Sequence, residues 1–215
     1  MHRVSITCRR KRKPLTTSAS LRLCARISQC SLLANGVTGV DGTMIFELSN
    51  KGNPYFSNIH PMLAGLLQAI AMDPWERYPE GSARLLPPPG VDEELLLDWQ
   101  DLVQPELRHH FDLERSLVVE DLAEMHEMKR GKGKVEAWSL EIPLDHADSW
   151  LTTLNALRLT LVEEHGFKEE DLTQNGAPDF SSERGLALMQ VNFYAFVQEC
   201  LLQTMESAEG GGDGA

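Results

Sequence analysis

Four side chains between positions 106 and 114 have the types and spacing that chemistry on one helix face needs. Glu106 and His109 are three residues apart, and His110 lies four residues from both Glu106 and Glu114. Residues three or four apart share a helical face. Carboxylates and imidazoles there bind divalent metals or act as general acids and bases. The pattern predicts a surface ladder of charged pairs or, as the alternative hypothesis, the site of a small hydrolase or metal-dependent enzyme.

The wider search for chemistry gives no second motif. Di-iron bundles need the Glu-x-x-His spacing twice, and here it occurs once. No Gly-x-Ser-x-Gly elbow is present, and Cys200 lies between apolar neighbours, where a thiol normally packs as an inert residue. The other histidines near predicted helix ends, His146 among them, are expected to be solvated. We therefore expect no catalytic or metal-binding residue and no cofactor.

One buried ion pair is predicted. Glu114 falls inside the apolar stripe of its helix, and Arg158 falls inside the stripe of the helix predicted for residues 146–165. A lone buried charge costs several kcal/mol, so each residue needs a partner. We expect Glu114 and Arg158 to meet across the helix interface, the alternative being that each side chain reaches past the edge of its stripe into solvent.

Hydrophobic periodicity places these residues in a mainly helical α+β protein. The class predicted is about five helices around one core with a small two-stranded antiparallel sheet. The strands are expected at 44–49 and 135–142, where side chains alternate, and are expected to pair with each other. A proline-rich loop is expected at 73–90. Gly166 is expected to cap the C-terminal end of the helix predicted for residues 146–165. The predicted helices are 59–72, 92–103, 105–128, 146–165 and 182–206.

The charge of the chain divides at Met44. The 215 residues carry 20 basic and 32 acidic side chains, a net charge of -12. Residues 1–43 hold eight of the basic side chains and one acid, a net of +7, so the remaining 172 residues stand at -19. Nucleic-acid binding depends on Lys and Arg neutralising phosphates. The acidic body is therefore not expected to bind nucleic acid.

Residues 1–43 are predicted to be a disordered basic extension outside the fold. The leading explanation is a misplaced start, with Met44 as the true first residue. The alternatives are a targeting segment, of which Arg and Ser content with few acids is typical, and a functional basic arm. We expect residues 44–207 to form a single domain and residues 208–215 a disordered tail. Apolar stretches near ten residues are too short to cross a bilayer, so no membrane partner is expected.

Two surfaces are candidates for a protein partner. One is the aromatic loop at 75–78, and the other is the acidic face at 92–101. The last helix has a wide apolar face, which indicates either central burial or contact with a second copy of the chain.

The order of these features resembles an uncharacterised bacterial family, domain-of-unknown-function family twenty-seventeen, over residues 44–205. The resemblance rests on Leu85-Leu86-Pro87, the segment from Glu106, and above all Trp150 with residues 155–158 on one helix. The family has no established activity. Its genes often lie beside the substrate adaptor of the Clp protease, which implies a role around regulated proteolysis.

The leading functional hypothesis is a non-enzymatic regulatory or protein-interaction domain in the cytoplasm. It rests on the acidic body, the lack of a catalytic motif and the resemblance. A single cysteine in the body fits a reducing compartment. The hydrolase or metal enzyme built on Glu106, His109, His110 and Glu114 is the alternative.

Overall fold

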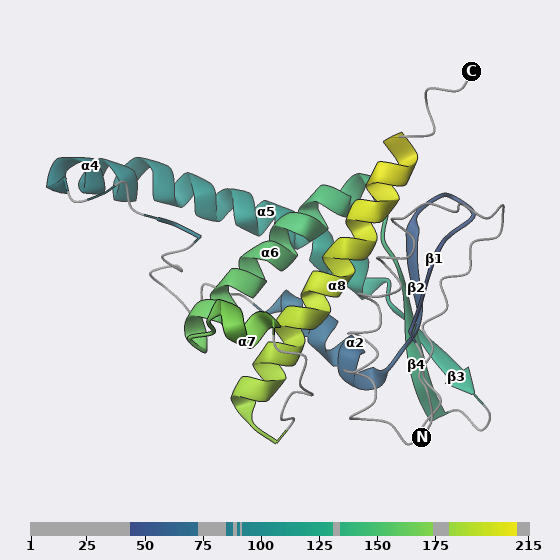
Figure 1. Cartoon of the computed structure of the whole chain (residues 1–215). Helices are drawn as coiled ribbons and strands as arrows, with labels where there is room; N and C mark the ends of the chain where they lie inside the picture. The colour runs from purple at the N-terminus through teal and green to yellow at the C-terminus, as the bar shows by residue number, and fades with distance from the viewer. Residues whose placement is uncertain are drawn as a thin grey trace.

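The computed structural model describes residues 44–72, 85–87, 90, 92–130, 134–173 and 181–209. Predictions for residues 1–43, for most of the proline-rich loop at 73–90 including 75–78, and for residues 210–215 of the tail lie outside these residues and stay predictions. Residues 208 and 209, predicted as part of the disordered tail, are helical. The predicted class is confirmed, since the described chain is mainly helical with a small antiparallel sheet (Figure 1). No helix in this part of the chain combines the length and apolar content that crossing a bilayer requires.

The sheet has four strands where two were predicted. β1 (Ile45–Leu48), β2 (Pro54–Ile59), β4 (Lys134–Glu141) and β3 (His126–Arg130) lie in this order, and each neighbouring pair is antiparallel. The two predicted strands exist as β1 and β4, but β2 lies between them. Phe56 of β2 is opposite Phe46 on one side and Leu140 on the other. The predicted direct pairing of the two strands is therefore wrong.

Both missed strands lack the usual strand pattern. β2 starts at a proline, and the register shifts between Phe56 and Ile59, where Asn58 has a φ of 56°. Asparagine tolerates this left-handed conformation, which breaks the alternation that predicts a strand. β3 reads His-Glu-Met-Lys-Arg, and its first three residues fall within the helix predicted for residues 105–128. It is an edge strand, where charged side chains are common because they discourage pairing with another chain.

The helices lie close to their predicted positions. α2 (Pro61–Gln68) continues as a 3-10 turn (Ala69–Ala71) and is capped by His60, whose Nδ1 accepts from the Met62 amide. α4 (Glu93–Asp98), a π-helical turn (Trp99–Val103) and α5 (Gln104–Ala123) follow one another without a break. The two helices predicted there form one rod, and α5 ends five residues before the predicted position.

The second half of the fold holds the remaining helices. A 3-10 turn (Leu144–His146) leads into α6 (Ala147–Glu164), then come the short α7 (Glu169–Thr173) and α8 (Glu183–Glu209). The predicted Gly166 cap is confirmed: Gly166 has a φ of 57°, and the amides of Gly166 and Phe167 bond the Glu163 and Val162 carbonyls. This is the Schellman arrangement, which ends a helix at a residue free to adopt positive φ.

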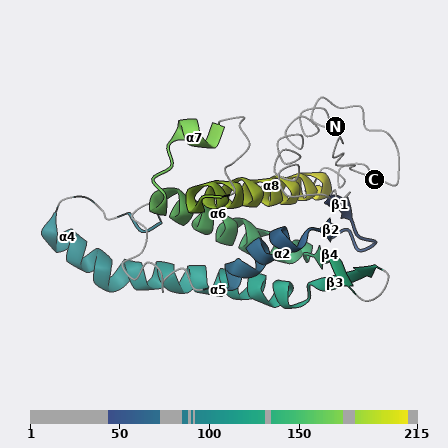
Figure 2. The same cartoon turned by 90° about the horizontal axis from the view of Figure 1, so that it is seen from below.

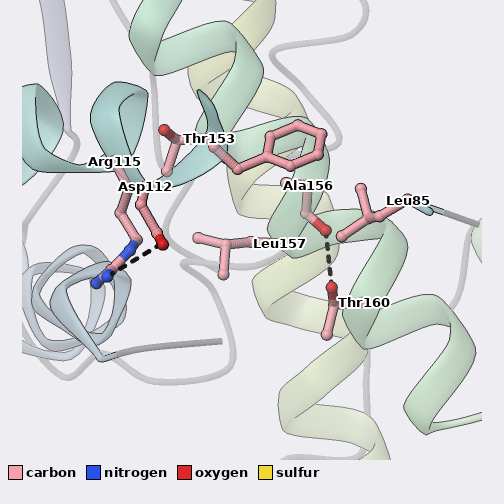
Figure 3. Close-up of a pocket in the computed structure, with 8 residues that line it drawn as sticks. Leu85, Asp112, Arg115, Thr153, Ala156, Leu157 and Thr160 are labelled. Atoms are coloured by element: carbon pink, nitrogen blue, oxygen red, sulfur yellow. Dashed lines mark hydrogen bonds and ion pairs between the residues drawn. The ribbon is translucent and has the colours of Figure 1, made fainter. Parts of the chain in front are cut away.

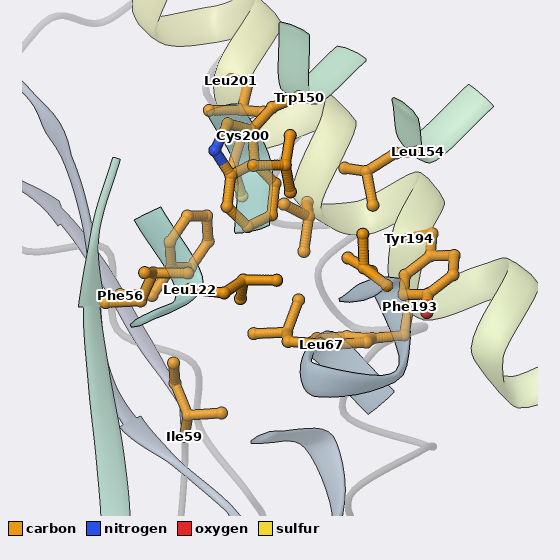
Figure 4. Packing of buried hydrophobic residues seen from close by; sticks show 14 of the residues in the cluster. Phe56, Ile59, Leu67, Leu122, Trp150, Leu154, Phe193, Tyr194, Cys200 and Leu201 are labelled. Atoms are coloured by element: carbon orange, nitrogen blue, oxygen red, sulfur yellow. The ribbon is translucent and has the colours of Figure 1, made fainter. Parts of the chain in front are cut away.

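The core lies between the sheet and the helices. α6 packs against both α5 and α8, while α2 and α5 contact β4 and α8 contacts β2. Trp150, Leu154 and Leu201 are fully buried, and Figure 4 shows them converging with Phe56 of β2. Tyr194 is buried as well, and its hydroxyl donates to the Leu66 carbonyl at 2.7 Å, which ties α8 to α2. Burial raises the pKa of the Tyr194 hydroxyl. Most apolar residues of α8 are buried, so central burial accounts for its wide face.

Candidate functional site

The rod formed by α4, the π turn and α5 starts as its sequence predicts. Asp92 caps the first helix, because its carboxylate accepts from the amides of Glu94 at 3.0 Å and Leu95 at 3.3 Å. Glu93 and Glu94 in the first turn add negative charge where the helix dipole favours it. These are local interactions, and they hold the start of the helix without help from the rest of the fold.

The π turn in the middle of the rod has a cause in the sequence. Pro105 has no amide hydrogen, and its ring would clash with the carbonyl of residue 101 in a regular helix. The backbone widens just before the proline, and the Gln104 amide bonds the Trp99 carbonyl five residues earlier. The rod thereby passes the proline without breaking. Turns of this kind inside α-helices are frequent at functional sites.

The N-terminal part of the rod stands apart from the body, and we call residues 92–107 the arm. In both views α4 lies beyond the ends of α6 and α8, at the end of the rod far from the sheet (Figures 1 and 2). No residue from 93 to 117 is buried, and the first buried residue of the rod is Val118. The arm, about 24 Å of helix, therefore lacks the buried apolar contacts that normally hold a helix in a fold, whereas Phe111 and Arg115 farther along α5 line a pocket against α6.

The arm carries exposed apolar side chains. Leu97 is 57% exposed and Leu102 67% exposed, and Leu95 and Val103 are also exposed. Single exposed leucines are ordinary on protein surfaces, whereas contiguous exposed apolar patches are the surfaces that other molecules commonly cover. The predicted acidic face at 92–101 lies on this arm, so acidic and apolar side chains occupy the same element.

The residues of the predicted enzyme site do not converge. Glu106, His109 and His110 are exposed on α5, and Glu114 is half-buried. The one contact among them is an interaction of 3.7 Å between His110 Nδ1 and Glu114 Oε1. Across the described ranges no three His, Cys, Asp or Glu side chains are grouped as metal ligands. The ladder of surface charges is the reading that this geometry favours.

The predicted buried ion pair is placed differently. Glu114 lies beside His110 on its own helix. Arg158 on α6 donates from Nη1 to Gln198 Oε1 of α8 at 2.6 Å, and Gln198 donates in turn to the Leu151 carbonyl at 3.0 Å. Among the ion pairs of the described residues, none joins Glu114 to Arg158 within 4 Å. Burial lowers the pKa of the Arg158 guanidinium. The polar network of Arg158 joins α6 to α8 instead of α5.

Sequence analysis missed a buried cluster of Asp121, His146 and Trp150, which we call the Asp121 cluster. Asp121 near the end of α5 is 6% exposed, and both of its oxygens lie within 3.1 Å of His146 Nδ1. Trp150 Nε1 donates to Asp121 Oδ2 at 2.8 Å. His146 is predicted to be solvated; its side chain is 26% exposed, and Asp121 holds its ring through Nδ1. A buried indole needs an acceptor for its N–H, and that requirement of Trp150 was the signal available in the sequence.

This cluster anchors one helix to the next. Asp121 belongs to α5, and its two partners lie at the start of α6, so one carboxylate fixes the crossing of the two helices. A carboxylate that orients an imidazole is also part of a hydrolase base, but such a base needs a nucleophile within hydrogen-bond reach. Among the described residues the His146 ring bonds Asp121 alone. The geometry therefore supports a structural role.

A small pocket lies between α5 and α6 (Figure 3). Its volume is about 20 Å³, far below the several hundred Å³ of small-molecule sites. The buried Thr153 hydroxyl in its wall has no hydrogen-bond partner within the described part of the protein. A pocket of this size beside an unpaired hydroxyl suits one ordered water. The lining residues are Leu85, Phe111, Asp112, Arg115, Thr153, Ala156, Leu157 and Thr160.

Comparison with known proteins places the chain in a family. Neither the curated proteins nor the solved structures give a match. The model of a family described as a domain of unknown function, DUF2017, matches residues 58–205. The match covers the arm, the Asp121 cluster, all of α5 and α6, and most of α8. The resemblance predicted from Trp150 and residues 155–158 is thereby confirmed, and the chain belongs to the DUF2017 family.

Proposed function

We propose that this protein is a non-enzymatic protein-interaction domain that binds its partner through the arm. The observation that carries the proposal is that the arm, residues 92–107, has no buried side chain and exposes Leu95, Leu97 and Leu102. A helix gains most of its stability from packing an apolar face. An arm of this length that leaves its leucines in water is best explained by a partner that covers them.

The rest of the described structure supports a binding role over a catalytic one. The candidate enzyme residues lie along one helix with a single contact of 3.7 Å between His110 and Glu114, and the pocket between α5 and α6 has the volume of about one water molecule. The Asp121 cluster is used to hold two helices together. The cytoplasmic location and the connection with Clp-dependent proteolysis, which composition and family resemblance imply, belong to this proposal as well.

Site-specific photo-cross-linking in the native cells of the protein tests the binding role. A photoreactive amino acid replaces Leu97 or Leu102 in the arm, or Leu186 or Leu202 on α8 as matched controls. The controls suit the purpose because Leu186 is 42% and Leu202 45% exposed, yet both lie outside the arm. We expect discrete cross-linked products from the two arm positions and none from the controls. Equal products from all four positions, or none from the arm, would contradict the proposal.

A further inference from the structure

The arm carries acidic side chains along its whole length, in addition to its exposed apolar side chains. Residues 92–107 contain six acidic side chains and no Lys or Arg. Asp92 uses its carboxylate to cap the helix, whereas Asp98, Asp101 and Glu106 follow beyond the capped turn. The acids of this segment are Asp92, Glu93, Glu94, Asp98, Asp101 and Glu106. A partner that covers the arm must therefore offset several negative charges while it buries leucines.

The apolar side chains of the arm have helical spacing. Leu95, Trp99, Leu102 and Val103 are separated by four, three and one residues, which is the spacing of one helix face. Leu95, Leu102 and Val103 are 54%, 67% and 43% exposed, and Trp99 is half-buried. The arm thus presents an apolar stripe flanked by carboxylates, which matches one half of a helix-to-helix interface.

We propose that the arm binds a basic amphipathic helix of another protein. This inference rests on the proposed function and names the chemistry of the partner. A helix has no free edge for strand addition, so the partner must pack side chains against the stripe, as amphipathic helices do with apolar residues at i, i+3, i+4 and i+7. Lys and Arg beside that stripe on the partner complement the carboxylates of the arm and speed the encounter.

Charge separates this partner from a second copy of the chain, from nucleic acid and from anionic lipid. A second copy in parallel would place the acids of one arm against those of the other, and like charges repel. Phosphates of nucleic acid and anionic lipid headgroups are repelled for the same reason. A basic amphipathic helix would bury the apolar stripe of the arm and offset its negative charge.

Binding to defined peptides tests the proposal on the full chain. The probe is an 18-residue peptide of leucine and lysine with leucines at i, i+3, i+4 and i+7. A peptide with glutamate in place of every lysine has the same stripe and the opposite charge. Calorimetry at low and at physiological salt should show binding of the lysine peptide that weakens with salt, because exposed charges are screened. The glutamate peptide should not bind.

Variants locate the binding. We expect Leu95→Ser combined with Leu102→Ser to weaken binding of the lysine peptide at least about tenfold, since both exposed side chains lie in the apolar stripe that the partner helix would cover. Asp98→Asn with Asp101→Asn should weaken it several-fold and reduce the salt dependence. The matched controls are Leu186→Ser with Leu202→Ser for the apolar change and Glu120→Gln with Glu124→Gln for the charge change. Glu120 and Glu124 are exposed at the far end of the same rod, and both controls should bind within about twofold of the unchanged chain.

The outcomes separate this inference from the proposed function. Equal binding by arm and control variants would overturn the basic-helix partner, and arm-specific cross-links in cells would still support an interaction domain. A dimer in sedimentation that the arm variants abolish would assign the arm to a second copy and overturn the inference. Cross-links from position 97 or 102 to residues 1–43 would assign it to the basic segment of the same chain, with the same consequence.

Discussion

The two ends of the α4–α5 rod share one continuous helix and have opposite surroundings. From residue 93 to 117 nothing is buried, whereas Val118, Asp121 and Leu122 are all buried within the last two turns. The anchored end holds apolar contacts and the carboxylate that fixes α6. The arm holds exposed leucines and acids. Under the proposed function, the anchored end stabilises the fold and the arm binds a partner, so substitutions at the two ends should have different consequences.

The largest effect is expected at Trp150, which completes the anchored end. Trp150→Ala leaves a large cavity at a side chain that is fully buried and removes the donor to Asp121. We expect a loss of about 4 kcal/mol in the free energy of unfolding. Urea denaturation followed by circular dichroism measures it. Trp99→Ala in the arm is the matched control and should cost less than about 1 kcal/mol. A similar loss for both variants would remove the contrast between the two ends.

The next effect compares one residue type at both ends of the rod. Leu122→Ala at the anchored end, where the side chain is 8% exposed, should cost about 3 kcal/mol. Leu102→Ala in the arm, where it is 67% exposed, should change the free energy of unfolding by no more than about 0.5 kcal/mol. Urea denaturation measures the free energy of unfolding of both variants. A Leu102→Ala cost close to that of Leu122→Ala would show that the arm is packed in solution.

Asp121 tests whether the carboxylate links the anchored end to α6. Asp121→Ala leaves the buried Trp150 N–H without an acceptor, and we expect a loss of about 2 kcal/mol. Asp121→Asn keeps an oxygen that can accept from the indole and should cost less. The pair is read by urea denaturation, with Asp101→Ala in the arm as the control. Equal costs for the Ala and Asn variants would show that the bond from Trp150 is not what the carboxylate supplies.

Features that depend on local sequence pattern could be predicted, and features that depend on long-range contacts could not. Elements with regular periodicity, such as α6 with its Gly166 cap, β1 and β4, were predicted because local pattern and tertiary packing agree. β2 was missed because Asn58 interrupts its alternation, and β3 because its residues are polar. The acidic face of the arm was found because its charges are consecutive in the sequence. Asp121 was not, because its partners lie 25 and 29 residues away and only the crossing of α5 and α6 brings them together.

The smallest effect concerns acid stability and a carboxylate of the body. Glu141 at the end of β4 accepts from Asn53 Nδ2 at 2.9 Å, and Asn53 Oδ1 accepts from the Leu144 amide. The hydrogen bond from Asn53, followed by one from Ser49, holds the pKa of Glu141 below its ordinary value of 4.5. The folded state therefore binds this proton less readily than the unfolded state. The contribution of Glu141 to stability is fully present above pH 4.5 and is lost as the pH falls through the lowered value.

Glu141→Gln should remove this dependence. At pH 7 the variant should be slightly less stable than the unchanged chain, and the difference in urea midpoint should shrink as the pH falls from 4.5. Asn53→Ala removes the main donor and should reduce the acid dependence in the same way. Leu102→Ala in the exposed arm changes no titratable group and is the control, and its difference from the unchanged chain should stay constant with pH. If the Glu141→Gln difference stayed constant from pH 7 to acid, the bond to Asn53 would not stabilise the fold through the charge of Glu141, and the contrast between the body and the arm would rest on apolar burial and Asp121 alone.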